Sequence, residues 1–271
     1  MENRALNNLR VAVIGSGNVA THLAAGLAAA GCEIVCVCSP TIAHARRLAG
    51  RFAGCSAVDS LASIPADADL YLISTVDSAV AGIAAGMPHV AGLVAHTSGS
   101  VPLAALAPAS AMTAVIYPLQ TFSREVAVRL DDIPFFTEAS TAEALAFADR
   151  IAGLLSPKVY HADSAHRKIL HIAGVLSCNF ANYLWDRTSD LLGRAGYSFD
   201  VVRPLIETTL RKAVEVGPHA AQTGPAMRGD RAVIDSHIAS LDPSTAEIYR
   251  IMTEAIIDSH KSNEQDKLRP Q

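Results

Sequence analysis

Two polar segments of the sequence carry the side chains best suited to acid–base chemistry, HTSGS beginning at His96 and YPLQTFS beginning at Tyr117. His96, Ser98 and Tyr117 are able to donate a proton to a carbonyl or imine, and the amide of Gln120 is able to orient a ligand. His96 also fits a plainer interpretation, a strand-end histidine whose ring is satisfied by backbone groups. We predict His96, Ser98 and Tyr117 as candidate catalytic residues and Gln120 as a substrate contact.

A second set of polar side chains interrupts the apolar stretch HRKILHIAGVLSCNFANYLW. Eleven residues make almost three turns of an α-helix, so Lys168 aligns with Asn179, and His171 with Asn182, on one broad side. Because eleven residues also rise about 16 Å, neither pair can meet a single substrate atom. These side chains either line a groove between two domains or face water or a partner subunit. We predict His171 as a catalytic candidate and Asn179 as a substrate contact.

A third polar cluster, TGPAMRGD, contains Arg228 and Asp230. The two side chains either pair with each other to brace a turn, or leave Arg228 free to hold an anionic substrate or a cofactor phosphate. On the second interpretation Arg228 is a substrate contact.

The segment VAVIGSGNVATHLAAGLAAAG places a G-x-G-x-x-A pattern directly after a strand-like run and directly before an Ala-rich helix. Gly15 permits a tight turn, Gly17 lets the backbone approach a pyrophosphate, and Ala20 lets the helix pack close to the sheet. The start of the helix offers free N–H groups and a positive dipole to phosphates. The pattern predicts a dinucleotide-binding turn whose contacts are Gly15, Ser16, Gly17, Asn18, Val19 and Ala20.

The residue at the end of the second strand indicates which dinucleotide is preferred. NAD enzymes place an acid there to bind the ribose hydroxyls, whereas this sequence has Ser39, which does not repel a 2′-phosphate. Arg46 or Arg47 could reach that phosphate from the following helix, unless the two arginines form a solvated helix face. NADP is therefore favoured over NAD. The predicted cofactor contacts outside the glycine turn are Ser39, Thr41, Arg46, Arg47, Thr75, Val76 and Asp77, and Asp77 is also a candidate helix N-cap.

Short β-branched runs alternate with Ala/Leu-rich stretches from Leu9 to about Asp163, which is typical of a parallel sheet with crossover helices. We expect strands at Leu9–Ile14, Glu33–Cys38, Leu70–Thr75, Leu93–His96, Met112–Tyr117 and Lys158–Tyr160, a hairpin-like or edge piece at Pro134–Thr137, and a helix at Thr141–Leu155. Ligands bind outside the carboxyl ends of such strands, where the glycine turn and the polar segments lie.

After His161 the strand-like runs stop and the apolar periodicity becomes helical. Apolar residues recur at intervals of three and four along one face of a long helix. They are Ile169, Ile172, Leu176, Phe180 and Leu184. We therefore predict a Rossmann-like domain at residues 1–161, a helical domain at 162–262 and a disordered tail at 263–271.

Composition narrows the class of protein. The chain has 271 residues, of which 50% are hydrophobic and 18% charged, so a sizeable core is expected rather than disorder. The net charge of −4 provides no electrostatic reason to expect nucleic acid or an anionic membrane as a partner. No apolar run has the length of a signal peptide or a membrane span, so we expect a cytoplasmic protein.

Five cysteines are present, and Cys36 and Cys38 alternate within a predicted strand as small hydrophobic residues do. The Cys-x-Cys spacing is not the usual one for zinc. Reduced thiols in the core are favoured over a metal or redox pair, and we expect no metal site.

The sequence resembles NADP oxidoreductases that join an N-terminal Rossmann-like domain to a C-terminal domain of unknown function numbered 2520. The resemblance covers nearly the whole chain and rests on five ordered motifs. They are GSGNVA at 15–20, HTSGS at 96–100, YPLQTFS at 117–123, LHIAGVLSCNF at 170–180 and TGPAMRGD at 223–230. This family is similar to pyrroline-5-carboxylate reductases and 6-phosphogluconate dehydrogenases. The resemblance implies an α/β Rossmann-type parallel-sheet domain followed by an all-α domain like the C-terminal domain of 6-phosphogluconate dehydrogenase, which forms a homodimer and closes the active site.

The sequence departs from these relatives in two places. Many relatives carry Ser-Arg at the end of the second strand, whereas Pro40 follows Ser39 here, so recognition of a 2′-phosphate falls to other groups. The Lys-x-x-x-Asn motif of 3-hydroxyacid dehydrogenases is missing, because Ile172 stands four residues after Lys168. That mechanism is therefore not carried over.

Our main hypothesis is an NADP-dependent oxidoreductase that acts on a small polar substrate bound between the two domains. A non-catalytic NADP(H)-binding sensor or regulatory protein is the alternative, because no acid–base couple is defined by spacing alone. A third hypothesis is that the helical domain serves mainly for oligomerisation.

Overall fold

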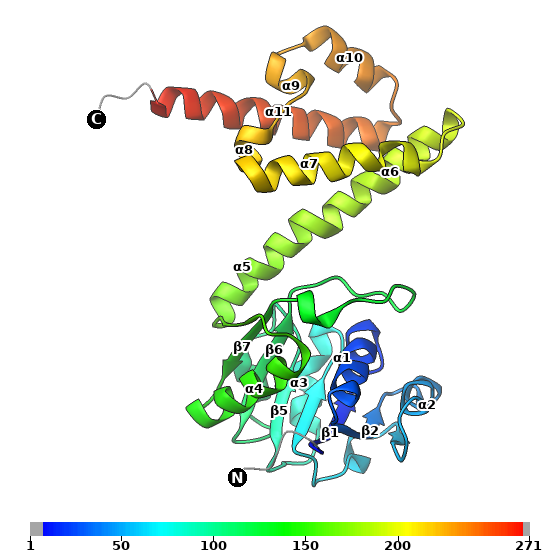
Figure 1. The fold of residues 1–271 in the computed structure, drawn as a ribbon, viewed down its shortest axis with the longest axis vertical. Coiled ribbons are helices and arrows are strands. Elements are labelled where there is room, and N and C mark those ends of the chain that lie inside the picture. The colour runs from blue at the N-terminus through cyan, green and yellow to red at the C-terminus, as the bar shows by residue number, and fades with distance from the viewer. Residues whose placement is uncertain (1–7, 268–271) are drawn as a thin grey trace. The chain divides into compact units, whose positions relative to one another are not determined.

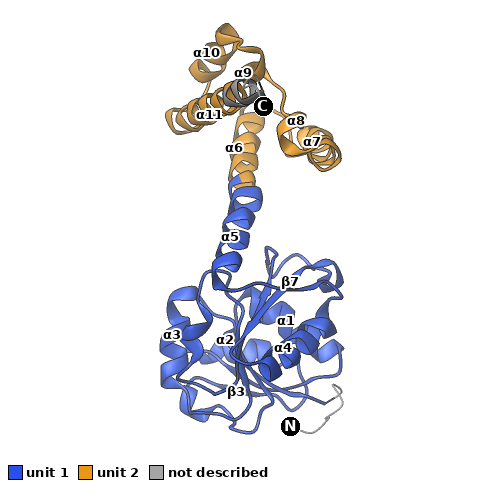
Figure 2. Ribbon diagram, turned by 90° about the vertical axis from the view of Figure 1, so that its left-hand side faces the viewer, with its two compact units in different colours: residues 1–180 blue, residues 181–271 orange. Residues whose placement is uncertain are grey.

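The chain forms two compact units, residues 1–180 and 181–271 (Figure 2). The computed structural model describes residues 8–267 of the chain. Unit 1 contains all the described strands, and the described elements of unit 2 are helices.

The eight strands of unit 1 form one sheet with the order β3-β2-β1-β4-β5-β6-β7-β8 (Figure 1). The strands are β1 Arg10–Ile14, β2 Glu33–Cys38, β3 Ser56–Val58, β4 Leu70–Ile73, β5 Leu93–His96, β6 Thr113–Pro118, β7 Phe135–Ala139 and β8 Val159–His161. Neighbouring strands are parallel except β6 and β7, which are antiparallel. The parallel order with its reversal at β1 and β4 brings the carboxyl ends of β1, β2, β4 and β5 to one edge of the sheet.

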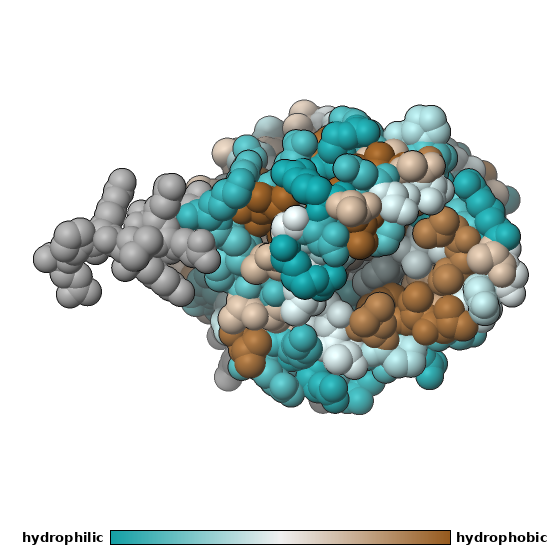
Figure 3. All heavy atoms as spheres, turned by 90° about the horizontal axis from the view of Figure 1, so that it is seen from above, coloured by the Kyte–Doolittle hydropathy of each residue, from teal (hydrophilic) through white to brown (hydrophobic). Residues whose placement is uncertain are grey.

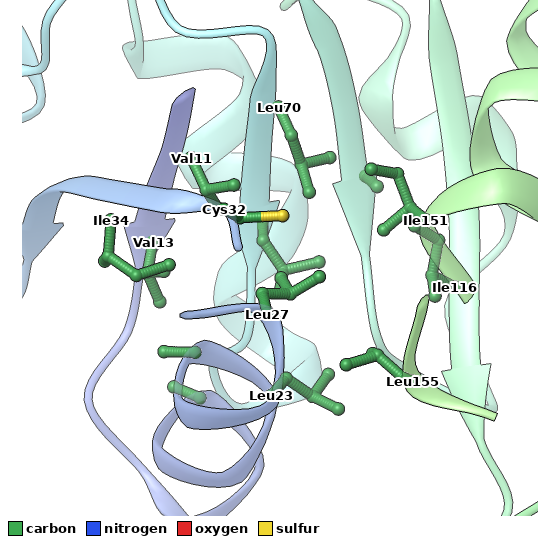
Figure 4. Close-up of a cluster of buried hydrophobic side chains, with 14 of the residues drawn as sticks. Val11, Val13, Leu23, Leu27, Cys32, Ile34, Leu70, Ile116, Ile151 and Leu155 are labelled. Atoms are coloured by element: carbon green, nitrogen blue, oxygen red, sulfur yellow. The ribbon is translucent and has the colours of Figure 1, made fainter. Parts of the chain in front are cut away.

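Helices cover both faces of the sheet, because successive residues of a strand point to opposite sides. The helices of this part of the chain are α1 Asn18–Ala29, α2 Ile42–Ala49, α3 Asp77–Gly86 and α4 Ala142–Leu155, with short 3₁₀ turns at η1 Leu61–Ser63, η2 Leu103–Leu106 and η3 Leu130–Asp132. Val11 and Val13 pack in one buried cluster with α1, α2 and α4 (Figure 4). Ala12 and Ile14 pack in a second cluster with α3. The predicted Rossmann-type class is thereby confirmed.

The strand predictions agree with the observed bounds to within two residues, and one strand was missed. β3 was not predicted, because its three residues are too few to show a period and Ser56 is exposed. The piece predicted at 134–137 is β7, which pairs with β6 as a hairpin-like element does. It is not an edge strand, because β8 pairs with its other side.

Helices follow β8 to the end of the described chain. They are α5 Ser164–Gly174, the π-helical turn η4 Val175–Phe180, α6 Ala181–Arg194, η5 Phe199–Val202, α7 Arg203–Val216, α8 Pro218–Ala221, α9 Pro225–Arg228, α10 Arg231–Ala239 and α11 Pro243–Lys267. The change from strands to helices thus occurs at the predicted position. The compact units divide later, after Phe180, because α5 is bonded to the sheet part of the chain through the buried Arg167.

Two expectations for the helical part need correction. The turn at 175–180 is π-helical, so the period of 3.6 residues that aligned Lys168 with Asn179 does not hold across it. α11 continues to Lys267, beyond the start of the predicted tail at 263, and residues 268–271 lie outside the described residues.

Most of the apolar side chains predicted to share one face of the long helix are exposed. Ile169, Leu176 and Phe180 each expose more than half of their surface. On α7, Leu205 and Val214 also expose more than half of their surface. Figure 3 shows hydrophobic patches on the visible face of the molecule. No helix among the described residues combines the length and the apolar character that crossing a membrane requires.

The cysteines are free thiols, and Cys32, Cys36 and Cys38 are buried as predicted. Burial raises the pKa of the Cys38 thiol to about 11, so it stays protonated. The prediction of a core position is wrong for Cys178, which is exposed on the π-helical turn.

Candidate functional site

The turn between β1 and α1 has the backbone geometry that the glycine pattern requires. Gly15 has a φ of +117°, and a Cβ atom there would lie 2.1 Å from the carbonyl oxygen of Ser74. A side chain is excluded on both counts. Ala20 is completely buried, which lets α1 pack closely against the sheet.

The N-terminus of α1 is open to a ligand at Gly17. Gly17 is the N-cap residue, makes no side-chain cap, and is followed by a first turn without acidic residues. A Cβ atom on Gly17 would meet no atom within 4 Å. The first N–H groups of α1 and the positive end of its dipole therefore remain available to an anion such as a pyrophosphate.

A cavity of about 710 Å³ connects the glycine turn to the polar segments predicted from the sequence. The predicted residues that line it are Gly15, Ser16, Gly17, Asn18, Val19, Ser39, Thr75, Val76, Asp77, Ser98, Tyr117, Gln120 and His171. All of them belong to unit 1. Among the described residues, the charged side chains that line this cavity are Asp59 and Asp77.

Tyr117 and His171 meet at this cavity from β6 and α5. The Tyr117 hydroxyl lies 3.3 Å from Nδ1 of His171, and the rings meet edge to face. Gly99 makes this approach possible, because a Cβ atom there would lie 2.8 Å from both side chains. Burial, followed by the charge of Asp77, raises the pKa of Tyr117, so its phenol stays protonated at neutral pH and is able to donate a proton.

A buried arginine, Arg167, holds the 98–101 loop in place from α5. Its Nε donates to the Ser98 carbonyl at 3.2 Å and its Nη2 to the Val101 carbonyl at 2.5 Å. Nη1 forms an ion pair with Glu138 on β7, whose carboxylate also accepts from the Ser164 hydroxyl at 2.9 Å. Because Arg167 is fully buried, these contacts replace its hydration and fix the loop relative to α5.

His96 does not line the cavity, although we predicted it as a catalytic candidate. Its ring is fully buried, and Nδ1 accepts from the Ser98 N–H at 3.2 Å. Burial, then the charge of Arg167, lowers the pKa of His96 to about 4, while the Pro102 carbonyl raises it by less. Its Nε2 has no hydrogen-bond partner of ordinary length among the described residues. The neutral ring thus supports the loop that carries Ser98, as the plainer interpretation expected.

Two further side-chain pairs support the polar wall. The Ser100 hydroxyl donates to the Asp77 carboxylate, and the Ser74 and Thr97 hydroxyls lie 3.1 Å apart. Asp77 is the first residue of α3, and the N-cap of this helix is Val76. The Asp77 carboxylate is bonded to Ser100 instead of to the helix backbone, so Asp77 does not act as the predicted N-cap. Ser98 Oγ accepts from the backbone N–H groups of Ser100 and Val101, which leaves its own proton free.

The end of β2 agrees only in part with the prediction. Ser39 is buried and accepts a hydrogen bond from the Ser16 hydroxyl at 3.0 Å. Thr41, Arg46 and Arg47 are exposed and are not among the lining residues of the cavity. The side chains of Arg46 and Arg47 lie on the solvated face of α2, which is the alternative that the sequence left open.

The remaining predicted substrate residues lie elsewhere. Asn179 lines a smaller adjoining pocket of about 290 Å³ that shares Tyr117, Gln120 and His171 with the main cavity. Arg228 is an exposed residue of α9 in unit 2. Its predicted pairing with Asp230 is not formed among the described ion pairs; Asp230 instead caps α10 by accepting from the Val233 N–H at 3.3 Å.

Sequence reasoning missed three residues that shape the site. Arg167 stands one position before Lys168, in the stretch HRKILHIAGVLSCNFANYLW, but nothing local marks it as buried. Asp59 lines the cavity from the end of β3, a strand too short to be predicted. Arg124 bonds to the glycine turn from a loop distant in the sequence. Among the described residues, no group of three or more metal-ligating side chains is present.

The fold and the glycine turn define a Rossmann-type dinucleotide-binding protein. Residues 10–94 match the family described as NADP oxidoreductase coenzyme F420-dependent, and residues 133–256 match a domain of unknown function, DUF2520. A protein of Bacteroides fragilis designated as an NADP oxidoreductase has 39% identity over 94% of this chain and 100% of its own, with a TM-score of 0.86. The chain therefore belongs to this family of NADP oxidoreductases, and the resemblance seen in the sequence is confirmed.

Two more distant structures are similar to this chain in fold alone. An imine reductase from Myxococcus stipitatus, in complex with NADP⁺, has 14% identity over 95% of this chain and 94% of its own, with a TM-score of 0.58. A pyrroline-5-carboxylate reductase from Coxiella burnetii has 12% identity over 94% of this chain and 98% of its own, with a TM-score of 0.53. No curated protein is detectably similar to the chain.

Proposed function

We propose that the chain binds NADP(H) in the 710 Å³ cavity and exchanges a hydride with a small polar substrate next to Tyr117 and His171. The observation that supports this proposal best is the continuity of the cavity, which reaches from Gly17 at the open start of α1 to the Tyr117–His171 pair. Gly15 to Val19 would hold the pyrophosphate, and Ser39 in place of an acid favours NADP over NAD. The imine reductase of similar fold binds NADP⁺, which supports the same choice of cofactor.

A bound nicotinamide supplies the hydride, and the chain supplies the proton. Tyr117 donates its phenolic proton to the oxygen or nitrogen of the substrate as the carbon accepts the hydride. His171, 3.3 Å from that hydroxyl, orients it and relays a proton back to the phenolate, giving one from Nδ1 as Nε2 takes one up from solvent. Ser98, with its own proton free, and Gln120 orient the substrate.

Calorimetry with NADPH, NADP⁺ and NAD⁺, followed by NADPH oxidation with a panel of imines and carbonyls, tests this function. We expect binding of NADP⁺ to be tighter than that of NAD⁺, and turnover of NADPH with at least one member of the panel. Tight NADPH binding without any turnover would instead support a sensor or regulatory protein. No heat of binding to well-folded protein with any of the three would contradict both.

We also propose that the helical part of the chain pairs two copies into a homodimer. The apolar side chains Leu205, Leu210 and Val214 on α7 are exposed by 67%, 66% and 78%. Such a surface is typical of an interface. Leu210→Glu is expected to reduce the mass in solution to that of one chain, whereas the exposed control Lys212→Glu is expected to leave it unchanged. A single-chain mass for the unmodified protein would contradict the proposal. Closure of the substrate site by the helical part, and contact of Arg228 with the substrate, remain predictions.

A further inference from the structure

Arg124 is bonded to the glycine turn from the loop that follows β6. Its Nη2 donates to the carbonyl oxygen of Ser16 at 2.8 Å, although 108 positions separate the two residues. Ser16 lies between Gly15 and Gly17, so the guanidinium stands beside the backbone that is shaped for a pyrophosphate.

The segment that carries Arg124 is held along the first turn of α1. Asn18 Nδ2 donates to the Phe122 carbonyl at 2.8 Å, and His22 Nε2 lies 2.7 Å from the Ser123 carbonyl. The rings of His22 and Phe122 also contact each other, with centroids 5.2 Å apart. These bonds keep Arg124 at the turn without any help from a ligand.

The guanidinium of Arg124 has donors to spare. An arginine carries five N–H donors, and the one hydrogen bond that we observe uses a single N–H. Arg124 is exposed, and no carboxylate among residues 8–261 forms an ion pair with it. Arg129 on the same loop differs in this respect, because it pairs with Asp131 at 2.7 Å. Arg124 is thus a cation without a counter-charge next to a site that fits an anion.

We propose that Arg124 binds a phosphate group of the dinucleotide; the sequence had offered Arg46 or Arg47 for the 2′-phosphate. The inference rests on the proposed function and adds to it the residue that supplies positive charge. The cavity wall includes Ser16 and Phe122, which flank the position of Arg124, whereas no described lysine or arginine lines the cavity itself. The phosphate is either the pyrophosphate, which NADPH and NADH share, or the 2′-phosphate, which NADPH alone carries.

The test compares Arg124→Gln, Arg124→Lys and the control Arg129→Gln by titration with NADPH, NADH and ADP. Gln retains an amide donor for the Ser16 carbonyl but removes the charge, so a purely structural role is largely preserved. We expect Arg124→Gln to weaken NADPH binding about tenfold or more, as loss of a charge-assisted phosphate contact does, and Arg124→Lys to recover part of it. Arg129→Gln is expected to bind like the unmodified protein. The melting temperature without ligand should be the same in all variants.

The three ligands distinguish the two phosphates. If the binding of NADPH, NADH and ADP is weakened equally in Arg124→Gln, Arg124 contacts the pyrophosphate. If the binding of NADPH alone is weakened, Arg124 contacts the 2′-phosphate. In either case the salt dependence of NADPH binding should become shallower in Arg124→Gln. Unchanged affinity for all three ligands, or Arg124→Lys as weak as Arg124→Gln, overturns the inference while the proposed function stands. If the unmodified protein bound none of the three, both would fail.

Discussion

The Tyr117 hydroxyl lies 3.3 Å from Nδ1 of His171, although 54 positions of sequence separate the two residues. Tyr117 is the penultimate residue of β6, and His171 lies on α5, the first helix after the sheet. Gly99 lies next to both side chains, and because it has no side chain of its own it does not keep them apart. This pair is the one that we propose as the acid–base couple, which spacing in the sequence did not define.

Replacing Tyr117 by Phe removes the proposed proton donor and little else. We expect kcat for an active imine or carbonyl to fall about a hundredfold, because general acid catalysis contributes on that order, while the Kd of NADPH stays within a factor of two to three. The matched control is Tyr160→Phe on β8, whose ring is half exposed and lies outside the cavity. Steady-state kinetics and calorimetry provide the two measurements. A Tyr117→Phe variant that keeps its kcat would remove Tyr117 from the mechanism.

The raised pKa of Tyr117 predicts how the rate of reduction changes at alkaline pH. Because burial raises its pKa above the ordinary 10.0, the phenol stays protonated at neutral pH and loses its proton only at higher pH. The rate of reduction that depends on this proton should therefore fall only above about pH 10. A profile of kcat from pH 6 to 11 measures it, and the fall should be absent in Tyr117→Phe. An alkaline limb below pH 9 that persists in this variant would point to another acid.

Replacement of Gly15 by alanine is expected to reduce stability, whereas replacement of Gly17 by alanine is expected to reduce NADPH affinity. At Gly15 the positive φ and the Ser74 carbonyl at 2.1 Å exclude a Cβ atom, so Gly15→Ala should lose about 3 kcal/mol or more of stability. At Gly17 the backbone is extended and the space is open, so Gly17→Ala should change stability by about 1 kcal/mol at most.

The binding measurement completes this comparison. A methyl group on Gly17 would stand where the pyrophosphate approaches α1, and we expect the NADPH affinity of Gly17→Ala to fall about tenfold or more. Urea unfolding and calorimetry on the same samples separate the two effects. If Gly17→Ala bound NADPH normally, the pyrophosphate would not lie at this turn.

The lowered pKa of His96 predicts that the folded protein loses stability in acid. Its pKa is lowered from 6.5 to about 4 in the folded protein, so between these pH values the unfolded chain binds more protons than the folded one. The free energy of unfolding should therefore rise with pH across this window and fall as the pH drops through it, by roughly 3 kcal/mol at most. Urea unfolding at intervals from pH 4 to 7 measures the slope.

The variant His96→Asn retains an acceptor for the Ser98 N–H and does not titrate in this range. Its stability curve should be flatter between pH 4 and 6.5 than that of the unmodified protein, even if its stability at pH 7 is lower. His44→Asn, a change at an exposed residue of α2, is the control and should keep the full slope. Equal slopes in His96→Asn and the unmodified protein would mean that His96 titrates normally.

Arg167 should be essential for the stability of the 98–101 loop. Arg167→Met leaves the Glu138 carboxylate and two loop carbonyls without their donor, and we expect a loss of about 3–5 kcal/mol in the free energy of unfolding. The double variant Arg167→Met with Glu138→Leu should recover part of that loss, because no partly buried charge is then left unpaired. Chemical denaturation of the single and double variants measures the coupling. A single variant within about 1 kcal/mol of the unmodified protein would refute this role.

The fold was largely predictable because its signals are local. The strand ends, the glycine turn and the helix at 142–155 depend on residues a few positions apart, such as the Thr141 hydroxyl that accepts from the Ala144 N–H. β3 and the π-helical turn escaped prediction. The first is too short to show a period, and the second departs from the period that the prediction assumed.

The candidate site was predictable only as a set of segments. The sequence indicated that the ends of β1, β2, β4, β5 and β6 would carry the ligand contacts, since all parallel strands end at the same edge of a sheet. It did not distinguish the buried His96 from the cavity residue Ser98, two positions later, because burial depends on what packs from the rest of the chain.

By itself, the sequence determined a dinucleotide-binding turn, an alternation of strands and helices up to residue 161, and a helical remainder. Backbone conformation and amphipathic period encode these features within short windows. Only the tertiary structure decided that Tyr117 meets His171, that Arg167 is buried under the 98–101 loop, and that Arg124 rather than Arg46 stands beside the glycine turn. These contacts join residues 54 to 108 positions apart, and chain folding, not local propensity, brings such residues together.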